Sequence, residues 1–324
     1  MAYTTIDDPS AYFHIQLYTG DGASTNAITN DANAGDFQPD WIWIKRRDGA
    51  DNHHVFDTSR GITKELNTNG TGAEGSGTNL VKSSDTDGFT LGDNGGVNGS
   101  SETYVAWQWI ANGGSTTTND ASATSVGDID SVYQANTTAG FSIVTYTHTG
   151  NDDRVAHGLG ATPKVVIIKE RGGSGSWYYV TTQVDGSLEY LLLETENTKA
   201  SLGYSVHTST TFPSLQFDNN DTAVAYCFAE IQGYSKFGSY KGNGSANGAF
   251  VYTGFTPAWV MVKRTDSANH WAILDSSRTD SSGNNSIDRW IRANTNAAEV
   301  DGQGIDFDFV SNGFKLRSAD NITN

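Results

Sequence analysis

The sequence predicts an all-β protein made of antiparallel β-sandwich modules, and three observations support that prediction. Glycine is abundant at 36 residues, and Asn, Asp, Ser and Thr fill the stretches between the apolar runs. These residues form turns. The apolar runs are short and rich in β-branched and aromatic residues, which is typical of strands. Helical periodicity is almost absent, and only Ser286–Val300 predicts one or two short helical turns.

The length and net charge of the chain exclude some classes of function. A chain of 324 residues can hold two or three domains with substantial cores. The net charge of −17 would repel nucleic acid, so we expect no nucleic-acid partner. An acidic surface suits a protein displayed in salt water, where screening weakens self-repulsion. No apolar run approaches the roughly 20 residues of a membrane helix, and the first residues lack the features of a secretory signal peptide.

One block of sequence occurs three times without a gap. The copies are Pro39–Arg60, Pro163–Val184 and Pro257–Arg278. They read PDWIWIKRRDGADNHHVFDTSR, PKVVIIKERGGSGSWYYVTTQV and PAWVMVKRTDSANHWAILDSSR. Matches before and after each block extend the repeat, so the chain contains three diverged copies of one module. The repeat is longer than the 20 to 50 residues of solenoids, and we expect tandem beads.

Each block predicts a β-hairpin. The proline opens a strand, where its missing N–H is tolerated, and Lys45, Lys169 and Lys263 stand six residues later. The lysines are expected to mark the point where the strand emerges into water. The strand cores WIWI, VVII and WVMV are apolar on both faces. We therefore expect the facing sheet to cover one side, and a loop, a neighbouring module or a partner chain to cover the other.

The repeats predict module boundaries. Module 1 is expected at residues 1–113, a polar linker at 114–139, module 2 at 140–235 and module 3 at 236–324. Modules 1 and 2 each end in an apolar strand, Thr103–Trp107 and Ala223–Phe228. Module 3 has no counterpart to that strand. We expect either that the natural polypeptide continues past Asn324, which we favour, or that another chain donates the strand.

The tryptophans at the start of the first block predict core rather than a sugar-binding strip. Trp41 and Trp43 are replaced by Val165 and Ile167 in the second copy, so a stacking role would not survive across the copies. The single cysteine, Cys227, lies in the apolar run AVAYCFAE. It is expected to be a small buried hydrophobe rather than a nucleophile.

The sequence offers few candidates for a chemical site. His53 and His54 are adjacent, which places them on opposite faces of a strand and denies them a shared metal. Asp57 and Arg60 recur as Asp275 and Arg278, and could form a small polar site at the surface; we favour a hydrogen-bonded turn with a surface ion pair.

Acidic and glycine-rich segments predict turns and loops rather than ligand sites. The acid pairs are Asp85/Asp87, Asp152/Asp153 and Asp306/Asp308, and Gly92–Gly99 is expected to be a loop. We expect no catalytic residue and no cofactor. SSDTDG at Ser83–Gly88 leaves a structural Ca²⁺ open, but it lacks the full EF-hand pattern.

Three long segments resemble a β-rich repeat of marine tailed bacteriophages. They are TTIDDPSAYFHIQLYTGDG, AHGLGATPKVVIIKER and FAEIQGYSKFGSYKGNGSANGAFVYTGFTPAWVMVKRTDSANHWAILDSSR. Proteins with this repeat are described as tail fibres or virion structural proteins. The resemblance covers nearly the whole chain and implies a place on the virion surface, with host contact through a lectin-like or jelly-roll-like β-sandwich. It supplies no catalytic residues.

The sequence and the resemblance together favour a non-enzymatic virion protein. We expect a tail or capsid appendage that makes weak, multivalent contact with host-surface glycans. Other virion proteins are expected partners, and the protein is expected to be a homo-oligomer, with a trimer favoured because fibres are commonly trimeric. A decoration or connector protein without a ligand is the alternative. A secreted glycan hydrolase is favoured less, because no acid pair recurs.

Overall fold

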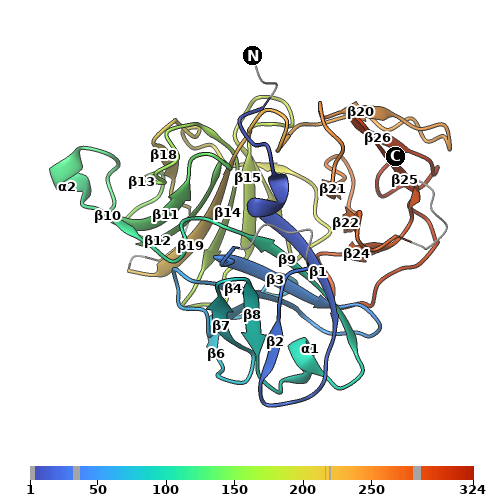
Figure 1. Ribbon diagram of the computed structural model, residues 1–324. Coiled ribbons are helices and arrows are strands. Elements are labelled where there is room, and N and C mark those ends of the chain that lie inside the picture. Colours follow the sequence, from blue (N-terminus) through green and yellow to red (C-terminus); the bar gives the residue numbers. More distant parts are fainter. Residues whose placement is uncertain (1–3, 32–36, 216, 219, 280–285) are drawn as a thin grey trace.

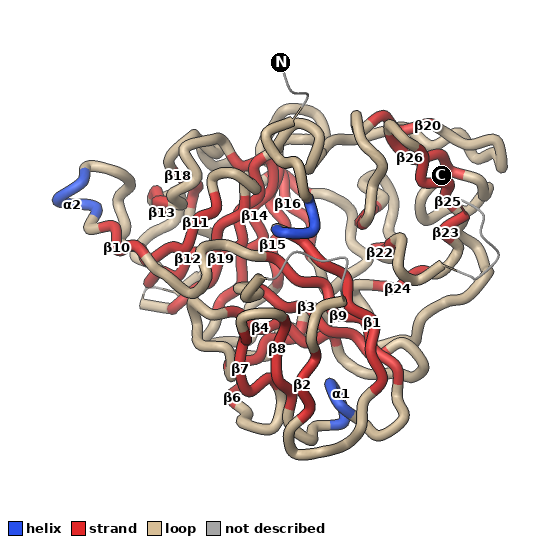
Figure 2. Tube along the Cα trace, viewed as in Figure 1, coloured by secondary structure: helices blue, strands red, loops and turns tan. Residues whose placement is uncertain are grey.

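The computed structural model describes residues 4–31, 37–215, 217–218, 220–279 and 286–324 (Figure 1). Strands dominate, and the helices are single short turns (Figure 2). These are the 3₁₀ turn Pro9–Ala11, α1 (Gly95–Asn98) and α2 (Ala121–Thr124). All the pairings between named strands are antiparallel, which confirms the predicted all-β class.

The strands fall into three modules in chain order. Module 1 holds β1 (Phe13–Thr19), β2 (Asn26–Ile28), β3 (Trp41–Arg46), β4 (His53–Asp57), β5 (Lys64–Asn67), β6 (Gly75–Ser76), β7 (Val81–Asp85), β8 (Gly88–Leu91) and β9 (Thr103–Trp109). Module 2 holds β10 (Thr117–Asn119), β11 (Ser131–Asn136), β12 (Phe141–Thr147), β13 (Arg154–Ala156), β14 (Pro163–Glu170), β15 (Trp177–Thr181), β16 (Glu189–Leu192), β17 (Ala200–Ser201), β18 (Thr211–Pro213) and β19 (Thr222–Ala229). Module 3 holds β20 (Phe250–Tyr252), β21 (Trp259–Lys263), β22 (Trp271–Asp275), β23 (Ser286–Ile287), β24 (Trp290–Arg292), β25 (Phe307–Val310) and β26 (Gly313–Leu316).

Each module pairs a central sheet with an outer sheet. The central sheets have the strand orders β1-β9-β3-β4-β5-β6, β10-β11-β12-β19-β14-β15-β16-β17 and β21-β22-β24. The outer sheets are β2-β8-β7, β13-β18 and β20-β26-β25-β23. Each module has its own apolar cluster. The architecture is therefore that of a sandwich, as predicted.

The three repeated blocks form the same hairpin, which confirms the prediction from their spacing. β3 pairs with β4, β14 with β15 and β21 with β22. Lys45, Lys169 and Lys263 lie opposite His53, Trp177 and Trp271 in the same register.

Lys45 and Lys169 do not emerge into water as expected, and Lys263 is partly exposed. Lys45 and Lys169 are fully buried. Each of the three ammonium groups donates to the carbonyl of the next residue, at 2.6 Å. The buried lysine closes the hairpin loop from inside, because the loop carbonyls need a donor. Burial lowers the pKa of all three lysines to about 8.

In modules 1 and 2 both faces of the repeated strand are covered, as its all-apolar pattern predicts, whereas β21 of module 3 is only partly buried. In module 1, Ile42 and Ile44 lie in the module's own cluster. Trp41 and Trp43, which are 2% and 0% exposed, lie in a second cluster, which we call the central core. Residues of all three modules meet there, including Trp107, Tyr226 and Trp271. The prediction that Trp41 and Trp43 belong to the core is confirmed.

The shared core corrects the expectation of tandem beads. The modules lie around a common centre, with module 1 in blue and teal, module 2 in green and yellow and module 3 in orange and red (Figure 1). Beads with separate cores would leave WIWI and VVII exposed on one face. The modules therefore bury those faces against one another.

Three further expectations are wrong. Residues 114–139 are not a separate linker, since β10 and β11 extend the central sheet of module 2. Ser286–Val300 forms β23 and β24 in place of helical turns; its aromatic and β-branched residues pair with neighbouring strands. Gly92–Gly99 is not only loop, because α1 forms inside it, with Asn94 accepting from the Gly96 amide at 2.8 Å.

Module 3 differs from the others at one strand. β3 and β14 each have a partner on both sides, β9 and β4 in one case and β19 and β15 in the other. β21 pairs with β22 alone among the described strands. Its opposite edge is where the sequence predicts a missing strand.

Candidate functional site: module junctions and an open groove

The recurring Asp and Arg residues lie at buried junctions between modules, and the expectation of a surface site is wrong. The Asp57 and Arg60 side chains are both 0% exposed. The predicted turn is present, because the Arg60 amide donates to Asp57 Oδ1 at 2.7 Å and Arg60 Nε donates to Oδ2 at 2.5 Å. Neither residue reaches solvent, so neither can serve a free substrate.

The junction between modules 1 and 2 contains two further charged residues. Arg60 Nη1 donates to Glu74 Oε2 at 3.1 Å. Arg171 of module 2 donates to the same carboxylate through Nε and Nη2, at 2.8 and 3.1 Å. Burial alone would raise the pKa of Glu74, but the two guanidinium groups hold it below its ordinary value. The bidentate geometry makes this a fixed link between the modules.

Module 3 repeats the arrangement against module 1. The Asp275 and Arg278 side chains are fully buried, with Arg278 Nε donating to Asp275 Oδ2 at 2.6 Å. Arg278 Nη1 donates to Glu299 at 3.0 Å, and Arg47 of module 1 binds that carboxylate through Nε and Nη2. The sequence pattern found the Asp and Arg residues. It missed Glu74 and Glu299, which lie outside the aligned blocks.

The junction between modules 2 and 3 has the same backbone contact without the Arg–Glu–Arg cluster found at the other two. The amides of Glu74, Lys199 and Glu299 donate to the carbonyls of Arg171, Thr265 and Arg47, at 2.7, 3.3 and 2.8 Å. These bonds link module 1 to 2, 2 to 3 and 3 to 1. The three modules therefore form a closed ring with approximate threefold order. Among the described residues, the junction between modules 2 and 3 has no Arg–Glu–Arg cluster; there His270 Nδ1 lies 3.1 Å from Glu196 Oε1.

Side-chain donors repeat the same ring. Trp177 Nε1 donates to the Asn67 carbonyl at 2.9 Å, and Trp271 Nε1 to the Leu192 carbonyl at 3.0 Å. In module 1, His53 stands at the position of Trp177 and Trp271. Its Nδ1 accepts from Trp43 Nε1 at 2.8 Å, so its Nε2 carries the proton and donates to the Arg292 carbonyl at 3.0 Å. His54 points to the opposite face toward Glu65, as predicted.

The central core contains one more repeated contact, and this one is incomplete. Tyr226 on β19 donates its hydroxyl to Asp57 at 2.7 Å, and Trp107 on β9 donates its indole N–H to Asp275 at 2.9 Å. The corresponding position in module 2 is Thr181. The Thr181 hydroxyl donates to the Lys164 carbonyl and accepts from the Gln183 amide, at 2.8 and 3.1 Å. By the order of the ring, an aromatic donor to Thr181 would come from a strand beside β21, where the described residues have none.

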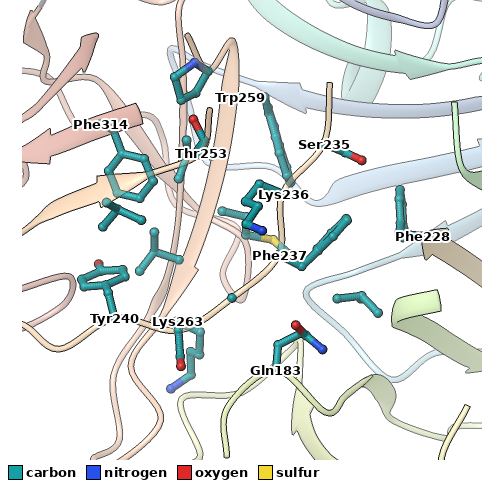
Figure 3. A pocket seen from close by; sticks show the side chains of 18 of the residues that line it. Gln183, Phe228, Ser235, Lys236, Phe237, Tyr240, Thr253, Trp259, Lys263 and Phe314 are labelled. Carbon is teal, nitrogen blue, oxygen red and sulfur yellow. The ribbon is translucent and has the colours of Figure 1, made fainter. Parts of the chain in front are cut away.

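A groove occupies that place. Its volume is about 1010 Å³, and Thr181 and residues from all three modules line it. Aromatic side chains dominate its inner part, including Phe13, Trp109, Phe228 and Trp259. Figure 3 shows Phe237 between Phe228 and Trp259, with Lys236, Gln183 and Lys263 nearby. The groove is the candidate binding site.

The described residues contain no group of three or more His, Cys, Asp or Glu that could hold a metal ion. Residues 83–88, considered for Ca²⁺, comprise the end of β7, a two-residue turn and the first residue of β8, and Thr90 donates to Asp85 at 2.6 Å. Cys227 is buried, as predicted, and burial raises the pKa of its thiol. In the part of the chain described here, no helix is long and apolar enough to cross a membrane.

Comparison with known proteins identifies a family. The family model described as Domain of unknown function (DUF7483) matches residues 8–324. The chain belongs to this family. The DUF7483 match covers all three modules, so the family corresponds to the closed ring rather than to one repeat. No curated protein and no solved structure matches the chain.

Proposed function

We propose that this DUF7483 protein is a non-enzymatic structural protein of a tailed-phage virion, placed on the particle surface as a tail or capsid appendage. Its β-sandwich modules make weak, multivalent contact with host-surface glycans. The resemblance to phage repeat proteins supplies the location, and the acidic charge of −17 suits display in salt water. Other virion proteins anchor the appendage, and the expected assembly is a homo-oligomer, with a trimer favoured.

One observation carries the non-enzymatic part of the proposal. The charged residues that recur between modules, Asp57/Arg60 and Asp275/Arg278, are buried in ion pairs that hold the modules together. A repeated catalytic site would keep its acid or base open to substrate. Here repetition preserves junctions, which is what a rigid display unit needs.

The experiment is a glycan array combined with a pull-down from intact host cells. Weak contact requires multivalency, so the protein is presented both as the free chain and on beads at high density. Binding that appears only at high density supports the proposal. Absence of binding to host cells and to the array in both formats, with the folded state verified by circular dichroism, would contradict glycan contact.

The open edge of β21 favours a second candidate, a connector or decoration protein. A strand edge and an apolar groove are suited to another chain of the particle rather than to a polar glycan. A pull-down with the other virion proteins as prey distinguishes the two candidates. Capture of a virion protein by a chain that ignores host cells would replace the appendage role with the connector role.

A further inference from the structure

The groove in module 3 corresponds to a strand in each of the other modules. In module 1, β9 lies between β3 and β1. In module 2, β19 lies between β14 and β12. Both strands run antiparallel to the repeated strand, and Lys45 and Lys169 lie opposite Val105 and Val224. β9 and β19 therefore indicate the kind of strand that would pair with the open edge of β21.

β9 and β19 share one pattern of side chains. Val105, Trp107 and Trp109 face the central core, as do Val224, Tyr226 and Phe228. The first residue between them is alanine in both strands, Ala106 and Ala225, and it faces the module's own cluster. The second is Gln108 in β9 and Cys227 in β19. An occupant of the groove should therefore carry alternating residues in the order valine, alanine, aromatic, any, aromatic.

The walls of the groove are suited to such side chains. Trp259 and Met261 on β21 are only partly buried, although they pack against the central core. Their counterparts Trp41 and Trp43 are almost fully buried beneath β9. Phe250 and Tyr252, on β20 beside the groove, are 47% and 60% exposed. Apolar surface of this kind in a soluble protein marks an interaction site.

Charge around the groove differs from the rest of the molecule. The charged residues that line it are Lys236, Lys241, Lys263 and Arg264, with Asp266 as the one acid. The whole chain carries −17. Lys236 and Arg264 pair with Glu230 and Asp266, at 2.8 and 2.7 Å. Lys241 and Lys263 are therefore the cations that would attract acidic residues beside the apolar segment of a partner.

We propose that the groove binds one extended segment of a partner polypeptide, which adds to the central sheet of module 3 as an antiparallel strand beside β21. The segment has the pattern of β9 and β19 and acidic flanks. Its first aromatic residue lies opposite Met261 and reaches Thr181, as Tyr226 reaches Asp57 and Trp107 reaches Asp275. Backbone hydrogen bonds to Trp259–Lys263 provide affinity, and the aromatic residues provide specificity. This role does not depend on the location of the protein on a virion.

The probe is a synthetic peptide with the β9 residues Thr103–Trp109 between pairs of glutamates. The control peptide has the same composition, with the valine and the two tryptophans moved by one position so that they face the other side of the strand. Binding is measured by calorimetry. Hydrogen exchange then locates the peptide, because the amides of β21 should exchange at least about tenfold more slowly in the complex.

A pair of protein variants tests the location independently. Met261→Arg places a charge on the floor of the groove and should weaken peptide binding at least about tenfold. Val206→Arg is the matched control, because Val206 is also an exposed apolar residue, at 49%, and does not line the groove. It should leave binding unchanged. Circular dichroism and melting of both variants verify that they fold.

Three results would overturn the proposal. The first is equal binding of the two peptides, which would indicate nonspecific apolar contact. The second is no binding of the β9 peptide to the unmodified chain. The third is native protein in which a segment of the same polypeptide already pairs with β21, since the groove would then have no place for a partner. Slowed exchange confined to β21 with the β9 peptide alone supports the proposal.

Discussion

Trp41 and Trp259 occupy the same position in their repeats but have different surroundings. Trp41 stacks on Tyr226, with ring centroids 4.6 Å apart, and is covered by β9. Trp259 contacts Trp107 and Trp109 edge-on and lines the groove. The same residue type is therefore buried in the core in module 1 and lines an open groove in module 3.

This difference predicts unequal costs of truncation. Trp41→Ala should lower the free energy of unfolding by about 3 to 5 kcal/mol, because it leaves a cavity in the central core. Trp259→Ala should cost roughly half of that or less, since its ring is already partly solvated. Urea unfolding measures both. Equal losses would show that Trp259 is as well packed as Trp41.

The buried ion pairs predict a second contrast. Asp57→Ala leaves Arg60 charged and buried and removes the acceptor of Tyr226, so it should cost about 3 to 5 kcal/mol. Asp301→Ala breaks an exposed pair with Arg289 and should cost under about 1 kcal/mol. Chemical denaturation of both variants checks this. If both variants lost less than about 1 kcal/mol, Asp57 and Arg60 would be a solvent-exposed ion pair rather than a buried one.

His53 predicts a dependence of stability on pH. Burial lowers its pKa well below the ordinary value, and the positive charge of Lys45 lowers it further. The unfolded chain therefore takes up the proton first. The stability that the neutral ring contributes is present above the unfolded pKa of about 6.5 and is lost as the pH falls below it.

The test replaces the pair Trp43 and His53 by the pair found in module 2, Ile167 and Trp177. Stability of the parent should fall between pH 7.5 and 5.5 by more than that of the Trp43→Ile, His53→Trp variant. His148, His157 and His207, whose pKa values burial also lowers, contribute equally to both proteins. Parallel pH profiles would contradict the role of His53.

Among the elements, the repeated hairpin is the same in all three modules, whereas the strand on its other edge is present in only two of them. β3, β14 and β21 have the same register toward their hairpin partners. β3 and β14 are covered on the other edge by β9 and β19, whereas β21 is not. An edge strand with apolar side chains is a liability unless something pairs with it.

Without any added peptide, this geometry predicts a gradient of amide exchange. Amides of β21 should exchange faster than those of β3 and β14, because one edge of β21 has no strand beside it. Hydrogen exchange followed by mass spectrometry of peptic fragments compares the three segments within one sample. Equal protection of β21 and β14 would mean that the open edge is already paired in solution.

At the scale of the whole molecule, the central core and the ring of junctions make the three modules one structural unit. Isolated modules would expose Trp41, Trp43, Phe141 and Ile167, which the other modules now cover. Stability is therefore a property of the complete ring.

The ring predicts cooperative unfolding. The 324-residue chain should unfold in one transition, with coincident midpoints by far-UV circular dichroism and tryptophan fluorescence. The fragment 114–235, which contains module 2 and its complete central sheet, should aggregate or remain loosely packed when it is expressed alone. Three separate transitions, or a stable soluble fragment, would restore the view of independent beads.

The amino-acid sequence alone predicts the all-β class, the three hairpins, the burial of Trp41 and Trp43, and a strand β21 that has no neighbour on its second edge among the described residues. These depend on local patterns: alternation, turn residues and the spacing of Lys45, Lys169 and Lys263 along the chain. The tertiary structure was needed to show which residues cover the second apolar face of each hairpin. It thereby showed that the modules form a ring rather than a row of separate beads. It also placed Asp57 and Arg60 in a buried junction with Glu74, which no local pattern connects to them. The physical reason is that burial depends on what lies across the interface, and residues from distant parts of the chain supply it.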